Sequence, residues 1–118
     1  PWSVAECVAT RVVDAVRADV SWSGGVTAVQ RTAHLADAFH MPIEIHTAIF
    51  HPLDLMNLHL CAALSNAGRF EVLWPMDRFA FGLKGALPVA QGVATLPEGP
   101  GLGMDLDWDL IEEATIAR

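Results

Sequence analysis

Two side chains that could transfer a proton, Asp19 and His46, each stand at the end of a short apolar run. Both runs have the length of a strand, and residues 26–40 between them repeat apolar side chains at helical spacing. Parallel strands joined by a helix have their carboxyl ends at the same edge of a sheet, so these two residues can be neighbours. A carboxylate beside an imidazole is a pair that can remove and return a proton near neutral pH.

Both residues also have ordinary structural explanations, and the residues alone leave these open. An Asp at the end of a strand often caps the loop that follows it, and a lone His more often serves in packing than in chemistry. If the pair is functional, Asp19 would fix the orientation and tautomer of the His46 imidazole. The other ring nitrogen would then be available to a substrate.

Helices and strands alternate three times through the first 75 residues. In chain order, the expected elements are a helix over residues 3–13, a strand over 15–20, a helix over 26–40, a strand over 43–46, a helix from 51 and a strand over 69–74. Residues 76–118 are rich in Gly and Pro, with a hairpin expected over 89–96 and a closing helix over 107–116. The pattern predicts an α/β fold for residues 1–75, followed by a tail.

Alternation along the strands predicts which side chains share a face. Arg17 shares a face with Asp19, and Glu44 shares a face with His46. On adjacent parallel strands Arg17 and Glu44 would form the layer below the acid–imidazole pair, and we expect an ion pair between them. The helix that begins near residue 51 is expected to bury one stripe, made of Leu53, Met56, Leu60 and Ala63 or Leu64.

Composition limits the class of protein. The chain has 118 residues, 53% of them hydrophobic, and a formal net charge of −7. It suits one compact domain and is shorter than the roughly 250 residues of a complete (β/α)8 barrel. An acidic chain without a basic patch argues against binding to nucleic acid and to anionic membranes. Two cysteines without dense spacing predict reduced thiols in a cytoplasmic protein.

The order of the elements and five stretches resemble the C-terminal part of the enolase superfamily, in its mandelate racemase/muconate lactonizing enzyme family (mandelate racemase subgroup). The stretches are ADVSWSGGVT, IEIH, NLHLCAAL, FEVL and LPEGPGLGMDLDWD. The resemblance covers nearly the whole chain. It implies that residues 1–75 are units 6–8 of a modified TIM barrel, (β/α)7β, and that residues 76–118 are its hairpin-and-helix tail.

The resemblance also implies a site. His46 matches the general base or acid at the end of the seventh strand, and Asp19 matches its partner at the end of the sixth. Glu71 matches the acid on the eighth strand, which contacts the substrate carboxylate or the enediolate; from the residues alone, it could instead pair with Arg69. The family reaction abstracts the proton alpha to a carboxylate, and Mg2+ stabilises the enediolate.

The resemblance further implies that essential parts lie elsewhere. The family places its metal ligands on the third, fourth and fifth strands, so we expect the first five strands and the capping domain to be outside this chain. The 118-residue chain alone is therefore expected to be inactive. The tempting alternative that His51 and His59 bind a metal with His46 is disfavoured by their spacing, which suits a helix start and a packed helix histidine.

The predicted function is that of an acid-sugar dehydratase fragment. Two alternatives remain open: a racemase or epimerase of a 2-hydroxy acid, and a non-catalytic half-barrel that self-associates through open strand edges. A small tautomerase with Pro1 as base is disfavoured, because residues 3–13 read as a helix rather than a strand. The expected partners are a carboxylate-bearing small molecule and either further copies of the chain or the missing part of the barrel, without nucleic acid or membrane. Trp22 could line the substrate pocket or serve in packing.

Overall fold

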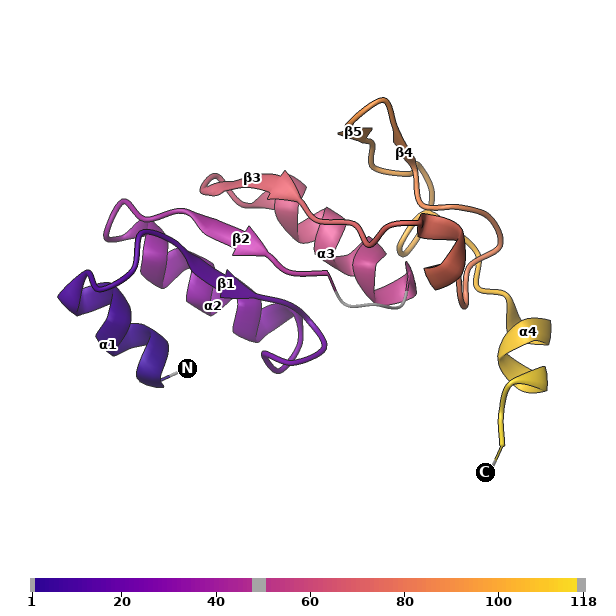
Figure 1. Cartoon of the computed structure of the whole chain (residues 1–118), viewed down its shortest axis with the longest axis horizontal. Coiled ribbons are helices and arrows are strands. Elements are labelled where there is room, and N and C mark those ends of the chain that lie inside the picture. The colour runs from indigo at the N-terminus through magenta and orange to yellow at the C-terminus, as the bar shows by residue number, and fades with distance from the viewer. Residues whose placement is uncertain (1, 48–50, 117–118) are drawn as a thin grey trace.

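A computed structural model describes residues 2–47 and 51–116, which form a three-stranded sheet backed by helices and an irregular tail (Figure 1). The first part contains α1 (Trp2–Thr10), β1 (Val16–Ala18), α2 (Val26–Asp37), β2 (Ile43–Ile45), α3 (His51–Ala63) and β3 (Ala67–Phe70). The tail contains a 3-10 turn (Met76–Phe79), the hairpin β4 (Val89–Ala90) and β5 (Val93–Ala94), and α4 (Trp108–Glu113). The predicted alternation, hairpin and closing helix are confirmed, whereas the strands and several of the helices, including the closing one, are shorter than predicted. The helical start agrees with the argument against a tautomerase, although Pro1 itself lies outside the described residues.

The three strands lie in the order β1-β2-β3, and both pairs are parallel. In the first pair, Arg17 lies opposite Glu44, as predicted. The amide of His46 donates to the carbonyl of Ala18 at 2.9 Å, so the two strands end side by side. The residues that follow β1 and β2 therefore meet at one edge of the sheet.

The pairing of β2 with β3 contains a shift of one residue. Ile43 pairs with Ala67 and Ile45 pairs with Phe70, so two steps along β2 match three steps along β3. An extra residue of this kind bends a strand and changes where its later side chains point. It sets Glu71 back by one residue, to the level of His46 just past the end of β2. The predicted strand over 69–74 is wrong in its bounds, because Glu71 follows β3 instead of lying inside it.

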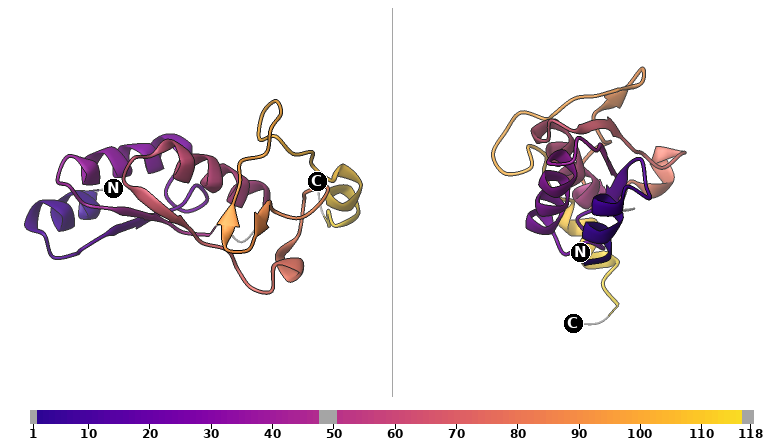
Figure 2. Two further views of the ribbon diagram at one scale, coloured as in Figure 1. Left: turned by 90° about the horizontal axis from the view of Figure 1, so that it is seen from above. Right: turned by 90° about the vertical axis from the view of Figure 1, so that its left-hand side faces the viewer.

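One face of the sheet is buried and the other is exposed. Val16, Ala18, Ile43 and Ile45 are at most 6% exposed, and they pack with α2 and α3, which lie together on one side of the sheet (Figure 2). The side chains between them, Arg17 and Glu44, point to the opposite, exposed face. The strands thus give the alternation of a sheet that has one covered face.

Helix α3 packs into two apolar cores. Leu60 and Leu64 join the core under the sheet, as predicted, where Leu53 and Met56 are half-buried, while Ala63 is exposed. The opposite flank of α3 packs against the tail, and this second core contains Leu55, Leu58, Leu83 and Leu87. The sequence predicted one buried stripe on this helix. It missed the burial of the second flank, because only the folded tail covers that flank. None of the helices within residues 2–47 and 51–116 has the length and apolar character needed to cross a bilayer.

Candidate active site

The structure brings Asp19 and His46 together at the carboxyl edge of the sheet. Nδ1 of His46 lies 2.9 Å from Oδ2 of Asp19. The Asp19 side chain is 4% exposed and that of His46 is 28% exposed, so the carboxylate lies underneath and the imidazole lies at the surface. An ionised carboxylate accepts a hydrogen bond from Nδ1–H, which favours the tautomer with a lone pair on Nε2.

The second oxygen of Asp19 caps the loop that follows β1. Oδ1 accepts hydrogen bonds from the amides of Ser21 and Trp22, both at 2.8 Å, and from the hydroxyl of Ser21 at 2.6 Å. The amide of Asp19 in turn donates to Oγ of Ser23 at 3.2 Å. The capping and proton-transfer interpretations of Asp19 are therefore compatible, since each uses a different oxygen.

Hydrogen bonds keep the Asp19 carboxyl ionised despite its burial. Burial by itself raises the pKa of Asp19, but the hydrogen bonds from Ser21, Trp22 and His46 outweigh it and leave the pKa below its ordinary value. The group is therefore negatively charged at neutral pH. This charge is what an imidazole needs from a partner that orients it and stabilises its protonated form.

A hollow of about 410 Å³ opens beside the imidazole. Its lining includes Arg17, Asp19, Trp22, Ser23 and His46. The Trp22 ring lies 5.5 Å from the His46 ring, tilted by 36°, and Trp22 is 76% exposed. Nε2 of His46 makes no hydrogen bond within the described part of the chain. The imidazole can therefore exchange a proton with a small molecule in the hollow.

Glu71 pairs with Arg17 on the exposed face of the sheet. Nη2 of Arg17 donates to Oε2 of Glu71, and the same oxygen accepts the amide of Thr47 at 3.0 Å. The predicted Arg17–Glu44 ion pair is wrong: within residues 2–47 and 51–116, Glu44 acts on Arg17 only through its charge. The alternative pairing of Glu71 with Arg69 is also wrong. The shift in β3 explains both outcomes, because it brings Glu71 to the end of β2, where Thr47 holds it.

The same contacts keep Glu71 ionised. The hydrogen bond from Arg17 lowers the pKa of Glu71 most, burial raises it, and the Thr47 amide lowers it further, so that the pKa lies below its ordinary value. The Arg17 and Glu71 side chains are 49% and 42% exposed, so the pair contributes little to stability. Its effect on the site is to place a fixed carboxylate beside the imidazole.

Two buried polar residues in α3, Asp54 and Asn57, contact the segments at the strand ends and were missed from the sequence. Oδ1 of Asp54 accepts from the hydroxyl of Thr47 at 3.0 Å. Asn57 contacts both strand ends, with Oδ1 3.2 Å from the amide of Val20 and Nδ2 2.9 Å from the carbonyl of His46. His51 is buried at the start of the helix. The available signal was a polar side chain at 54 and at 57 within a largely apolar helix.

The other histidines do not assemble a metal centre. Nε2 of His59 lies 3.1 Å from the carbonyl of Leu102, which agrees with a packed helix histidine. Nδ1 of His51 is buried and has no hydrogen-bond partner among the described residues, and burial lowers the pKa of His51. Within residues 2–47 and 51–116, no three His, Cys, Asp or Glu side chains converge as metal ligands. The residues present here do not by themselves fit a Mg2+ site.

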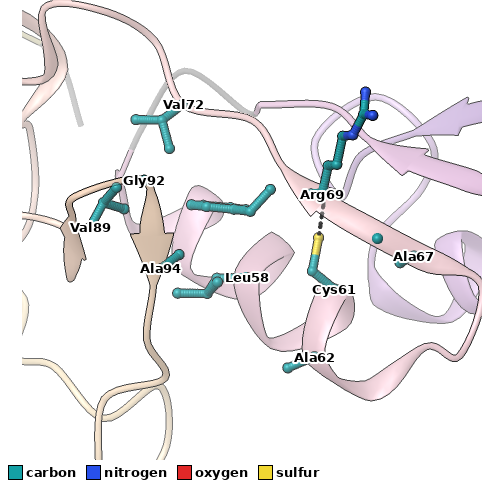
Figure 3. A pocket seen from close by; sticks show the side chains of 11 residues that line it. Leu58, Cys61, Ala62, Ala67, Arg69, Val72, Val89, Gly92 and Ala94 are labelled. Carbon is teal, nitrogen blue, oxygen red and sulfur yellow. Dashed lines mark hydrogen bonds between the residues drawn. The ribbon is translucent and has the colours of Figure 1, made fainter.

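A larger hollow, of about 660 Å³, lies between α3, β3 and the hairpin (Figure 3). Most of the residues that line it are apolar, among them Leu58, Val72 and Val89, and the Arg69 side chain points away from it. Sγ of Cys61 donates to the carbonyl of Arg69 at 3.4 Å, and burial raises the pKa of this thiol to about 11. Among the described residues, this lining contains no carboxylate and no imidazole, so the candidate proton-transfer site is the smaller hollow beside His46.

Acid should weaken the fold through Asp19. Because its pKa is lower in the folded than in the unfolded chain, the unfolded chain binds more protons; the stabilisation is complete above about pH 4 and is lost as the pH falls further. The slope for this carboxyl is at most about 1.4 kcal/mol per pH unit. Urea unfolding between pH 7 and pH 3 should show a smaller loss in Asp19→Asn than in the unchanged protein. Equal losses would contradict this assignment.

Comparison with known proteins gives a consistent family. The family described as enolase C-terminal domain-like matches residues 1–110. The chain is 28% identical over 112 residues to arabinonate dehydratase of Saccharolobus solfataricus, covering 95% of this chain and 30% of that enzyme. It is 30% identical over 111 residues to D-mannonate dehydratase of Sphingomonas sp. strain SKA58, covering 92% of this chain and 28% of that enzyme. The chain thus spans less than a third of these relatives.

Solved structures agree with the sequence relatives. A mandelate racemase/muconate lactonizing enzyme family member from Pseudovibrio sp. superposes with a TM-score of 0.91 at 28% identity, covering 98% of this chain and 31% of that one. A mandelate racemase/muconate lactonizing enzyme from a marine actinobacterium, crystallised with magnesium, gives a TM-score of 0.78 at 30% identity. The match covers 93% of this chain and 30% of that one. The parallel sheet with its backing helices is therefore similar to about a third of each of these proteins.

Proposed function

The chain belongs to the enolase C-terminal domain-like family, and from this premise we propose that it carries the proton-transfer residues of an acid-sugar dehydratase. Its relatives include acid-sugar dehydratases and mandelate racemase-like enolases. The observation that carries the proposal is the Asp19–His46 pair, at 2.9 Å, beside a hollow with Nε2 unbonded among the described residues. The substrate is a small sugar acid that carries a proton and a hydroxyl on the carbon alpha to the carboxylate, and a second hydroxyl on the beta carbon.

One imidazole suffices for the loss of water. Neutral His46 accepts the proton alpha to the carboxylate at Nε2, and the electron pair of the broken C–H bond enters an enediolate. The imidazolium, held by ionised Asp19, then returns that proton to the departing beta-hydroxyl as the C–O bond breaks. Water leaves, the enol product becomes a 2-keto-3-deoxy acid, and His46 is neutral again.

Glu71 has a narrower role than a proton donor. Its lowered pKa leaves it ionised, so it accepts hydrogen bonds from Arg17 and Thr47. We assign it to hold these two groups at the mouth of the site. Direct contact with the substrate carboxylate or enediolate, the role implied by the resemblance, stays a prediction that needs a cation or donor between the two negative groups.

Mg2+ belongs to the proposal through residues outside the described chain. Enolase-superfamily enzymes generally use Mg2+, and one similar structure contains magnesium. When bound, the ion stabilises the negative charge of the enediolate. The described residues offer no ligand set of their own, so we propose that the remainder of a longer protein or a second polypeptide supplies it, and that the first five barrel strands and the capping domain come with it.

The test is a substrate panel with the complete protein that contains this chain. We expect one of arabinonate, mannonate, xylonate or galactonate, with MgCl2 present, to give a 2-keto-3-deoxy acid that reacts with semicarbazide. The 118-residue chain alone should give none. Proton NMR in D2O separates the alternatives: exchange of the alpha proton without loss of water would favour a racemase or epimerase. Absence of both reactions across sugar acids and simple 2-hydroxy acids would reject the proposal.

A further inference from the structure

Asn57 is a fully buried side chain whose amide bridges the two strand ends of the site. It is 0% exposed. Its Oδ1 accepts from the amide of Val20 at 3.2 Å, and its Nδ2 donates to the carbonyl of His46 at 2.9 Å. One partner is a donor and the other an acceptor, so the orientation of the amide is determined by chemistry.

The position of this bridge explains its importance. β1 ends at Ala18 and β2 ends at Ile45, and the last backbone bond between them joins the His46 amide to the Ala18 carbonyl. Beyond that bond, no further backbone hydrogen bond joins the two segments among the described residues. Helix α3 begins beyond the end of β2 and runs back under the sheet (Figure 1), so its second turn can reach both chains.

Asp19 and His46 form the proton-transfer dyad. The two backbone groups held by Asn57 belong to a residue of this dyad and to the residue next to it in the chain. Val20 follows Asp19 directly, and the carbonyl is that of His46. The Asp19–His46 hydrogen bond depends on the spacing of these two chains, because both side chains are short and leave the backbone at the sheet edge. The Asn57 amide thus links the two strand ends by hydrogen bonds at the level of the Asp19–His46 pair.

We propose that Asn57 is a positioning residue that sets the Asp19–His46 geometry, an inference that rests on the proposed function for its catalytic consequence. A primary amide of this length gives a donor to one of these groups and an acceptor to the other at once. A leucine of similar size fills the same space and leaves the Val20 amide and the His46 carbonyl unbonded in a buried place. The strand ends would then move apart to reach water.

The chain provides a matched control in Asn66. Its Nδ2 also bridges two backbone segments, donating to the carbonyls of Ala33 at 3.0 Å and Met41 at 3.1 Å. It lies at the opposite end of the sheet, where the Asn66 carbonyl accepts the amide of Ile43. Replacing either asparagine with leucine removes two side-chain hydrogen bonds, so both changes test stability, but only one of them touches the dyad.

The experiment compares Asn57→Leu with Asn66→Leu in the complete protein. Both variants should unfold at a lower temperature. Only Asn57→Leu should lower kcat, by about 10- to 100-fold with KM changed by no more than about threefold, because a displacement near 1 Å at a catalytic group has such an effect. Ring 15N NMR should show His46 as the Nδ1–H tautomer in the unchanged protein and in Asn66→Leu, and as a mixture in Asn57→Leu. Equal kcat and equal tautomers in the two variants would overturn the inference.

A measurement on the unchanged protein keeps the inference testable if Asn57→Leu does not fold. The Val20 amide should exchange its hydrogen within about tenfold of the rate of the His46 amide, which donates to Ala18, although Val20 lies beyond the strand. Exchange of Val20 at the rate of an unprotected amide would overturn the inference. Both NMR readouts are independent of turnover. If His46→Asn kept full activity, the proposed function would fail while these readouts still decided the role of Asn57.

Discussion

Replacing His46 with asparagine is expected to lower the dehydration rate of the complete protein by about 10²- to 10⁴-fold, the range for loss of a general acid–base group. Asparagine has no nitrogen that accepts a proton near neutral pH, so removal of the alpha proton and return of that proton to the leaving hydroxyl both fail. Exchange of the alpha proton with D2O should fall by a similar factor. Rates with the best sugar acid of the panel and exchange followed by proton NMR are the two measurements.

His34→Asn is the control for this substitution. His34 is an exposed histidine in the last turn of α2, and His and Asn have similar helix propensities, so the change should leave activity within about twofold. Full activity of His46→Asn, with a folded protein, would assign the proton transfer to a residue outside this chain. Loss of dehydration with retained exchange would mean that His46 serves only the leaving hydroxyl.

Replacing Asp19 with asparagine should lower the rate by up to about 10⁴-fold, the effect of the same change where a buried Asp orients a catalytic histidine. The amide can still accept from Ser21 and Trp22 through one oxygen. Its NH2 group would then face Nδ1 of His46 and donate to it, so the ring proton moves to Nε2. The nitrogen that faces the hollow would carry a hydrogen and could no longer accept the alpha proton. Steady-state rates and the ring 15N spectrum of His46 measure the two consequences.

Asp14→Asn is the matched control, because Asp14 is exposed just before the amino end of the same strand. We expect its activity to be unchanged. If Asp19→Asn lost activity while His46 kept its Nδ1–H tautomer, the loss would come from the loop of Ser21–Trp22 rather than from the imidazole. If it stayed fully active, Asp19 would be a loop cap and no more.

The sequence was sufficient for the features that depend on local pattern. Periodicity of apolar residues predicted the alternation of helices and strands, the hairpin and the closing helix. The rule that parallel strands end at one edge predicted that Asp19 and His46 would meet, and the structure places their side chains 2.9 Å apart. The short stretches that resemble the mandelate racemase/muconate lactonizing enzyme family led to the family that the comparisons then gave.

Contacts that depend on register or on a second packed layer required the tertiary structure. The extra residue in β3 has no sequence signature, yet it moves Glu71 to the end of β2 and gives Arg17 a partner other than Glu44. The second flank of α3 is buried only because the tail folds over it. Asn57 reads as one polar residue in an apolar helix, and its two partners, 37 and 11 residues away in sequence, become visible only when the helix lies under both strand ends. Local pattern depends on neighbours along the chain, whereas register and buried hydrogen bonds depend on segments that only folding brings together.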